Sequence, residues 1–107
     1  MEVVRTSSYR KDVKRLGLTD EEQAALERAI AVNPEAGDVI KGLKGVRKIR
    51  FAMGGRGKRG GGRAVYLVLF TQDRAILLRA YAKNEQDDLS TGDRKAIAAL
   101  LKEIGND

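Results

Sequence analysis

Two apolar segments in the second half of the chain constrain its fold more than any other feature. Residues 64–70 read AVYLVLF, and residues 75–83 read AILLRAYAK after a short turn. Val, Ile, Tyr and Phe favour strands, and a run that is apolar at nearly every position is typical of a strand in the middle of a sheet. The two segments therefore predict a central strand and a neighbouring strand.

A third strand is predicted over residues 46–53, because apolar and basic side chains alternate there. Side chains two positions apart along a strand share a face. Ile49 and Phe51 are thus expected to point one way, and Lys48 and Arg50 the other. The same alternation in residues 75–83 predicts two faces, one with Ile76, Leu78 and Ala80 and the other with Arg79, Tyr81 and Lys83.

Helix signals precede these strands. Ser7 or Ser8 can cap a short helix that Gly17 ends. Thr19 begins a second helix with a capping box, and this helix stops before Pro34 because the residue before a proline disfavours the helical conformation. The pattern predicts two short helices joined by a tight turn.

Two further elements complete the predicted architecture. Residues 1–5 are expected to form a short strand, and a final helix is predicted from a capping box at Ser90 to Gly105. The chain is therefore expected to be one domain, residues 1–107, of the α+β class. It would consist of a small antiparallel sheet with two N-terminal helices and a C-terminal helix, the helices packed on one face of the sheet.

A glycine-rich basic segment, GGRGKRGGGR at residues 54–63, connects two of the predicted strands as a long hairpin loop. It lies within residues 39–72, which hold nine Lys or Arg residues and no Asp or Glu. A solvated surface hairpin would explain the glycines, but it does not explain why every charge is positive. An acid-free block of this kind favours a polyanionic partner such as a nucleic acid.

The composition excludes several kinds of site. The chain has no cysteine and no histidine, so disulfides, thiolate metal sites, cysteine nucleophiles and the usual general base are absent. Gly57-Lys58 is followed by Arg59 and then by a strand, which does not fit a phosphate-binding P-loop. We expect no metal and no cofactor. No secretory signal or membrane-spanning segment is evident in the sequence, so the expected compartment is the cytoplasm.

The predicted sheet would gather basic residues on one exposed side. These are Lys48 and Arg50 from one strand, Arg63 from the next, and Arg79, Tyr81 and Lys83 from the third. Such a face can bind phosphates, and it can also cleave RNA by promoting attack of a 2′-hydroxyl on the adjacent phosphate. That reaction needs a base, cations that stabilise the phosphorane and an acid for the leaving oxygen. A lysine in a cluster of positive charge can serve as a base without histidine, and the arginine fork suits phosphorane oxygens.

Three ordered motifs resemble the RelE/HigB-type toxins of bacterial toxin–antitoxin pairs, within the RelE/ParE superfamily. They are residues 45–51 (GVRKIRF), residues 57–66 (GKRGGGRAVY) and residues 81–85 (YAKNE). The resemblance implies ribosome-dependent cleavage of mRNA without a metal. It also implies neutralisation by a cognate antitoxin, often one with a helix-turn-helix DNA-binding part. The implied partners are thus the antitoxin, the ribosome and mRNA, with no membrane.

The resemblance also implies roles for individual residues. The catalytic set that it indicates is Lys48, Arg50, Arg63 and Lys83. The candidate contacts to RNA or the ribosome are Arg47, Arg56, Lys58, Arg59, Arg79 and Tyr81. Some family members have a tyrosine about where this chain has Ser90, so the general acid stays unassigned, and Tyr81 is a candidate for that role or for packing. Two alternatives remain open, a ParE-like toxin that acts on DNA gyrase and a non-catalytic RNA-binding module.

Overall fold

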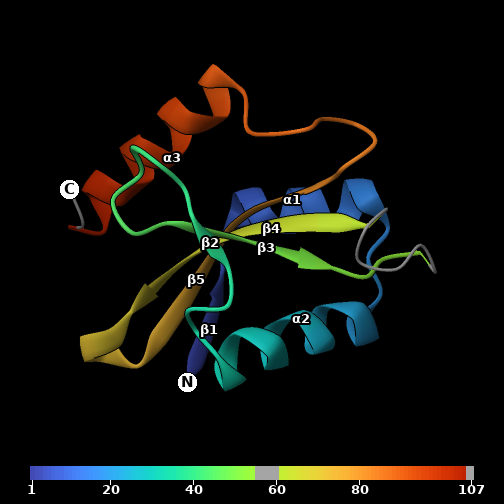
Figure 1. Cartoon of the computed structure of the whole chain (residues 1–107), viewed down its shortest axis with the longest axis horizontal. Helices are drawn as coiled ribbons and strands as arrows, with labels where there is room; N and C mark the ends of the chain where they lie inside the picture. The colour runs from blue at the N-terminus through green and yellow to red at the C-terminus, as the bar shows by residue number, and fades with distance from the viewer. Residues whose placement is uncertain (55–60, 106–107) are drawn as a thin grey trace.

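The computed structural model describes residues 1–54 and 61–105, which form a five-stranded sheet and three helices (Figure 1). In chain order the elements are β1 (Glu2–Arg5), α1 (Ser7–Leu16), α2 (Asp20–Val32), β2 (Asp38–Val39), β3 (Arg47–Phe51), β4 (Gly62–Leu69), a 3-10 turn η1 (Phe70–Gln72), β5 (Arg74–Ala82) and α3 (Thr91–Glu103). These elements confirm the predicted α+β fold. No helix in the described ranges is long and apolar enough to cross a membrane.

The strand order is β1-β5-β4-β3-β2, which places β4 at the centre as the sequence predicted. β4 is antiparallel to both β3 and β5, whereas β1 runs parallel to β5. The sequence did not predict β2, whose two residues pair with Lys48 and Arg47 at the edge of β3. The sheet is therefore mostly, but not wholly, antiparallel.

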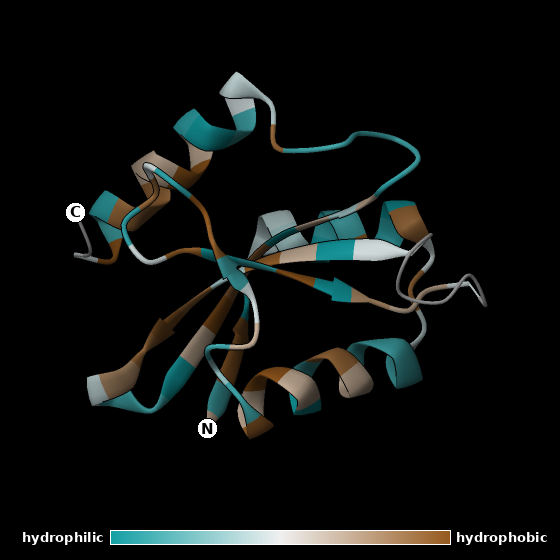
Figure 2. Ribbon diagram, in the orientation of Figure 1, coloured by the Kyte–Doolittle hydropathy of each residue, from teal (hydrophilic) through white to brown (hydrophobic). Residues whose placement is uncertain are grey.

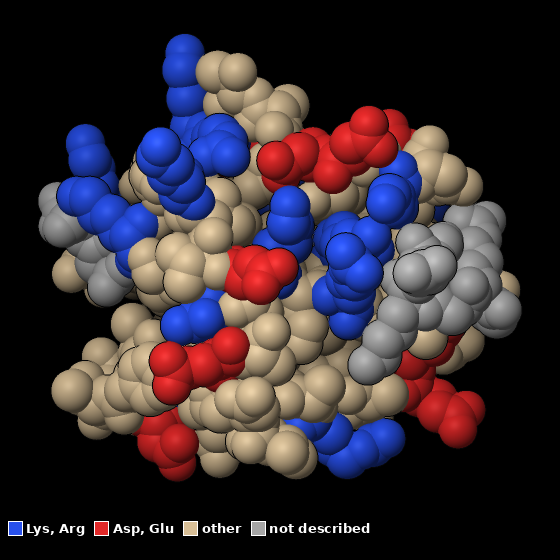
Figure 3. All heavy atoms as spheres, in the orientation of Figure 1, with Lys and Arg blue, Asp and Glu red and all other residues tan. Residues whose placement is uncertain are grey.

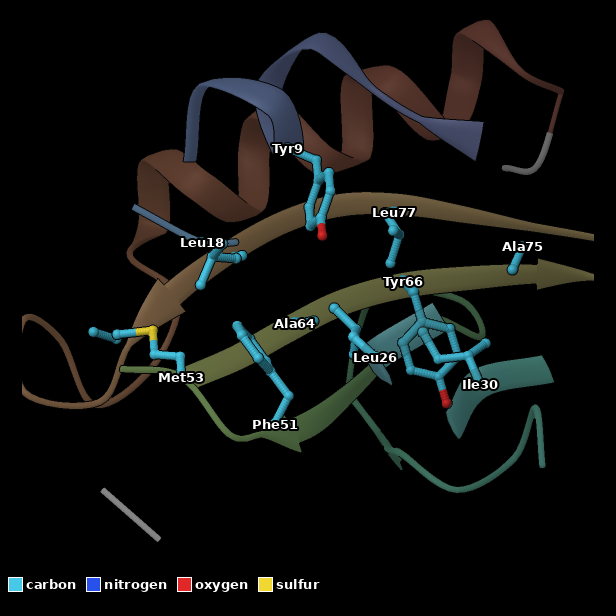
Figure 4. Packing of buried hydrophobic residues seen from close by; sticks show 12 residues of the cluster. Tyr9, Leu18, Leu26, Ile30, Phe51, Met53, Ala64, Tyr66, Ala75 and Leu77 are labelled. Carbon is cyan, nitrogen blue, oxygen red and sulfur yellow. The ribbon is translucent and has the colours of Figure 1, made fainter. Parts of the chain in front are cut away.

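The helices cover both faces of the sheet, so the expectation that they pack on one face is wrong. On one face, Tyr9 of α1 and Leu26 of α2 pack with Tyr66 of β4 (Figure 4). On the other face, Ile97 of α3 packs with Val65 of β4. Apolar residues run along β4 and along the sides of the helices in Figure 2. A strand that is apolar on both sides must be covered on both sides, which explains the two layers of helices.

A β-bulge in β5 breaks the predicted alternation of its side chains. The register between β4 and β5 shifts between Val65 and Tyr66, which leaves Leu78 as the extra residue on β5. As a result Ile76 and Leu78 pack on the α3 side, whereas Ala80 joins the core beneath α1 and α2. The expected common face for these three residues is therefore wrong.

The helix ends follow the predicted capping chemistry with one change. The N-cap of α1 is Thr6, not Ser7 or Ser8, and its hydroxyl accepts a hydrogen bond from the first turn. Gly17 ends α1 in the left-handed conformation, with φ of 68°. The predicted capping boxes at the starts of α2 and α3 are both present.

Candidate functional site

A polar pocket of about 330 Å³ opens on the α3 side of the sheet. Six residues line it: Lys48, Arg50, Arg63, Lys83, Asp38 and Asp87. The four basic residues are the catalytic set that the family resemblance implied, and the structure brings them together from β3, β4 and the residue after β5. They are four of the six side chains that the strand pattern placed on one face. Basic side chains gather near the middle of the face drawn in Figure 3, between groups of acidic side chains.

The register of the sheet places these basic side chains. Arg50 pairs directly with Arg63 across β3 and β4. Lys48 lies two residues before Arg50 and so shares its face. The backbone N–H of Lys83 donates to the carbonyl oxygen of Gly61 at 3.1 Å, which continues the β4–β5 ladder beyond β5. Four positive charges from distant parts of the sequence therefore occupy one small region.

Arg63 is the most buried of the four, with 6% of its surface exposed. Its Nη1 donates to the carbonyl oxygen of Gly62 at 3.1 Å. Gly62 itself has no room for a side chain, because an added Cβ would lie 2.4 Å from the ring of Phe51 on β3. The close approach of β3 and β4 at this point holds Arg63 opposite Arg50 at the wall of the pocket.

Lys48 has a counterion in the structure. Its Nζ lies 3.4 Å from Oδ1 of Asp88, in the segment that joins β5 to α3. The pKa of Asp88 is lowered, first by the hydrogen bond from the backbone N–H of Leu89 and then by Lys48, so this carboxylate is ionised at neutral pH. Within residues 1–54 and 61–105, the side chains of Arg50 and Lys83 form no ion pair. Positive charge in the pocket is therefore only partly compensated.

Two carboxylates of the pocket, Asp38 and Asp87, were missed by the sequence reasoning. Asp38 belongs to the two-residue strand β2, which the sequence did not predict. The loop before it is fixed by the hydroxyl of Tyr66, which accepts from the N–H of Gly37 at 3.0 Å and donates to the carbonyl of Pro34 at 2.8 Å. The only signal in the sequence was the position of Asp38 immediately before the acid-free block.

Arg47 is not brought to the pocket. It lies between Val46 and Lys48 in the sequence and points to the opposite face from Lys48. Its Nη1 donates to the carbonyl oxygen of Gly37 at 2.8 Å, and its Nη2 lies 3.4 Å from a carboxylate oxygen of Glu35. These contacts hold the loop between α2 and β2. The candidate RNA contacts Arg56, Lys58 and Arg59 lie outside the described residues.

The expectation that Arg79 and Tyr81 lie on an exposed face is wrong. Arg79 is held in ion pairs with Asp12 of α1 and Asp93 of α3. Tyr81 is 1% exposed and packs in the core on the α3 side. Its hydroxyl has no hydrogen-bond partner among the described residues, and burial raises the pKa of Tyr81 to about 12. Covered by α3 and the preceding segment, Tyr81 has a packing role in this structure.

The pocket is suited to bind a phosphate group and to move a proton. Two guanidinium groups can each form paired hydrogen bonds to phosphate oxygens, and two lysine amines can hold or release a proton. Among the described residues, no group of three or more carboxylates is arranged to hold a metal ion. The chemistry that these side chains offer is stabilisation of an anionic phosphorus centre.

Comparisons with known proteins agree with this fold. A sequence model of one protein family, described as the RelE toxin of the RelE / RelB toxin-antitoxin system, matches residues 1–106. The isolated E. coli RelE toxin, solved in a P21 crystal form, superposes with a TM-score of 0.56 at 19% identity, over 94% of this chain and 98% of that chain. A mutant of E. coli toxin RelE in the free state gives a TM-score of 0.54 at 14% identity, over 92% of this chain and 94% of that chain. At these identities the solved structures show a shared fold.

Proposed function

The chain belongs to the RelE toxin family, and we propose that this toxin cuts mRNA on the ribosome through the four basic residues of the pocket. The observation that carries the proposal is the convergence of Lys48, Arg50, Arg63 and Lys83 on one pocket of about 330 Å³. Positive charge that is only partly compensated attracts the RNA backbone.

The proposed reaction is internal transesterification of the RNA strand. The 2′-oxygen attacks the adjacent phosphorus while the bond from phosphorus to the 5′-oxygen of the next nucleotide breaks. The products are a 2′,3′-cyclic phosphate and a 5′-hydroxyl. One base must take the proton of the 2′-hydroxyl, and one acid must give a proton to the leaving oxygen.

The residues of the pocket supply these roles. Arg63 and Arg50 face each other across the strands and can donate to the non-bridging oxygens, where negative charge grows in the transition state. Lys48 and Lys83 are the titratable donors of the pocket, and we assign the base to one and the acid to the other. The two roles would be distinguished by the pH profiles of Lys48→Ala and Lys83→Ala.

The partner proposed from the family is a cognate antitoxin. We expect it to cover the basic pocket or to block entry into the ribosome, using an acidic or amphipathic segment that folds on binding. A helix-turn-helix part that binds DNA would complete such an antitoxin. A cross-linking map that places the antitoxin away from Lys48 and Lys83, with no block to ribosome entry, would contradict this.

The test of the proposed function is cleavage by the purified toxin of mRNA on programmed ribosomes, with the ends of the fragments mapped. We expect cuts on the ribosome that end in a cyclic phosphate, and loss of cutting in the double variant Lys48→Ala/Lys83→Ala. Lys102→Ala, which removes an exposed cation of α3 outside the pocket, is the matched control. Intact mRNA together with double-strand breaks in cellular DNA would point to a gyrase poison. Binding of RNA without any cut would point to a binding module.

A further inference from the structure

A network of ion pairs connects α1 and β5 to the segment that joins β5 to α3. Positive and negative side chains alternate along this network, which reaches both ends of the segment. Its members, in order of contact, are Glu85, Arg15, Asp12, Arg79 and Asp93. None of the five lines the basic pocket. The function of the pocket therefore does not account for this network.

Asp12 is the centre of the network and is 2% exposed. One carboxylate oxygen accepts from Nε of Arg79 at 2.7 Å and from the backbone N–H of Ala80 at 2.8 Å, and the other accepts from Nη1 of Arg15. A buried carboxylate is tolerated when its hydrogen bonds are made, but a buried ion pair adds little net stability compared with apolar packing. The network therefore calls for an explanation other than stability.

Asp12 and Arg15 make the backbone hydrogen bonds that a neighbouring strand would otherwise make with β5. β1 pairs with β5 only as far as Leu77, and the hydroxyl of Thr6 reaches the carbonyl of Leu78 at 3.3 Å, so no strand pairs with the outer edge of β5 beyond that point. There Asp12 accepts the N–H of Ala80, and Nη2 of Arg15 donates to the carbonyl of Ala80 at 3.2 Å. Two side chains of α1 thus satisfy the open edge of β5 just before the strand reaches the pocket.

Two ion pairs of the network, one from Arg15 and one from Arg79, hold the two ends of the connecting segment, residues 83–90. At the start, Nη2 of Arg15 donates to Oε1 of Glu85 at 2.8 Å, and Glu85 also accepts from the N–H of Ala82 at 3.0 Å. At the end, Nη1 of Arg79 donates to Oδ1 of Asp93 at 2.6 Å, in the first turn of α3. Figure 1 shows this segment arching from β5 to α3.

The held segment carries three charged groups of the site. Lys83 and Asp87 line the pocket, and Asp88 pairs with Lys48. The segment contains no helix or strand, so its backbone has few hydrogen bonds of its own to fix these side chains. The segment also contacts the sheet through the backbone N–H of Lys83, which donates to Gly61, and through the ion pair of Asp88 with Lys48. The ion pairs of Glu85 and Asp93 add a contact at each end of the segment.

We propose that Asp12 is a positioning residue that sets the place of Lys83 by fixing the segment 83–90 through Arg15 and Arg79. The catalytic part of this inference rests on the proposed function, because it assigns the network to the same pocket. Asp12 touches neither the pocket nor the RNA that would enter it. It acts on the edge of β5 and on the two anchors of the segment.

The first test measures the segment without any use of activity. In Glu85→Gln the side-chain shape and an acceptor for Ala82 remain, but the charge that pairs with Arg15 is lost. We expect tryptic cleavage after Lys83, mapped by mass spectrometry, to be about tenfold faster than in the wild type, because local opening exposes the segment. Glu27→Gln is the matched control, since it removes the carboxylate of another Arg–Glu pair, 2.7 Å from Arg5, away from the segment.

The second test separates positioning from a general structural role. Under single-turnover conditions on ribosomes, Glu85→Gln and Arg15→Gln are each expected to lower the cleavage rate at saturation about tenfold, while the half-saturating toxin concentration changes less than about twofold. Both variants break the link between Arg15 and Glu85, and Arg15→Gln also removes the contacts to Asp12 and Ala80. The double variant should therefore lose no more than Arg15→Gln alone. Asp12→Asn should show the largest loss of rate, and if it fails to fold the two outer variants still decide the question.

The outcomes separate this inference from the proposed function. Unchanged tryptic cleavage and unchanged amide exchange in residues 84–90 of Glu85→Gln and Arg15→Gln would overturn the positioning role. Equal losses of rate and affinity with faster proteolysis at every site would also overturn it, because a structural role alone explains that pattern. If the wild-type chain cuts no mRNA while these variants still show faster cleavage after Lys83, the proposed function fails and anchoring of the segment by the network stands.

Discussion

Replacement of Arg63 by alanine is the sharpest test of the pocket. Arg63 is 6% exposed, lies directly opposite Arg50 and lines the pocket, so we expect its guanidinium to meet a phosphate that enters there. Its contact is therefore expected to form with the reacting phosphate and not with the ribosome surface. Loss of one such preorganised donor lowers a rate by about 10²–10³-fold, or about 2.7–4 kcal/mol of transition-state stabilisation.

The effect on folding is expected to be small, which makes the variant interpretable. Truncation of a buried side chain leaves a space that costs stability. Arg63→Ala also removes a positive charge directly opposite Arg50, and like charges at paired positions on neighbouring strands repel each other. These two effects oppose each other, so we expect a melting temperature within a few degrees of the wild type.

The assay is single-turnover cleavage of a labelled mRNA on programmed ribosomes, with toxin in excess and varied in concentration. We expect the rate at saturation to fall about 10²-fold or more while the half-saturating concentration stays within about threefold of the wild type. Arg63→Lys keeps the charge but loses the planar guanidinium group that can donate two hydrogen bonds to one phosphate, so it should recover only part of the rate. A wild-type rate at saturation with a large loss of affinity would show that Arg63 is a binding residue and refute the transition-state role.

Three further predictions concern the glycine-rich loop, the hairpin and an acidic residue. A triple variant neutralises the basic loop residues Arg56, Lys58 and Arg59. If these charges contribute to binding alone, the variant should bind ribosomes more weakly and cleave normally at saturation. The slope of log binding constant against log salt concentration should fall by about 2. Loss of the saturated rate would contradict this. Gly62→Ala places a Cβ 2.4 Å from the Phe51 ring and should cost about 1–3 kcal/mol in urea unfolding, whereas Gly92→Ala in α3, where the nearest atom is 3.8 Å away, should be neutral or stabilising. Burial acts to raise the pKa of Asp93, but hydrogen bonds from Ser90, Arg79 and Gln86 outweigh it and lower this pKa to about 2. The contribution of the Asp93 carboxylate to stability is therefore complete above pH 3.8 and is lost as the pH falls toward 2. In Asp93→Asn, the free energy of unfolding should depend less on pH in that window.

The sequence was sufficient to predict that the basic residues of β3 and β4 meet. Alternation along β3 and the hairpin between β3 and β4 are local patterns, and they predict one face for Lys48, Arg50 and Arg63, the three side chains that the pocket gathers from these strands. The same reasoning failed at β5, because AILLRAYA alternates without a break while the strand contains a bulge at Leu78. A bulge depends on how the partner strand pairs, and that information is not in the strand's own sequence.

The buried charges were harder to predict for a different reason. Asp12 lies between Tyr9 and Leu16 at helical spacing, so the sequence does place it on the buried side of α1. What the sequence does not show is the open edge of β5 that gives this carboxylate its partners. The length of β1 decides where that edge begins, and element ends are set by tertiary contacts more than by local preference.

The acidic residues around the pocket change how its positive charge should be understood. Four cations close together repel each other, and Asp38 and Asp87 in the pocket, with Asp88 at Lys48, offset part of that repulsion in the free protein. On the proposed function, an RNA phosphate would compete with Asp88 for the ammonium group of Lys48, which would lower the affinity for RNA. Asp87 and Asp88 lie on the segment that the Asp12 network anchors, whereas Asp38 lies on a strand at the far edge of the sheet. On these two proposals, the segment would affect the stability of the free pocket, its affinity for phosphate and the placement of Lys83.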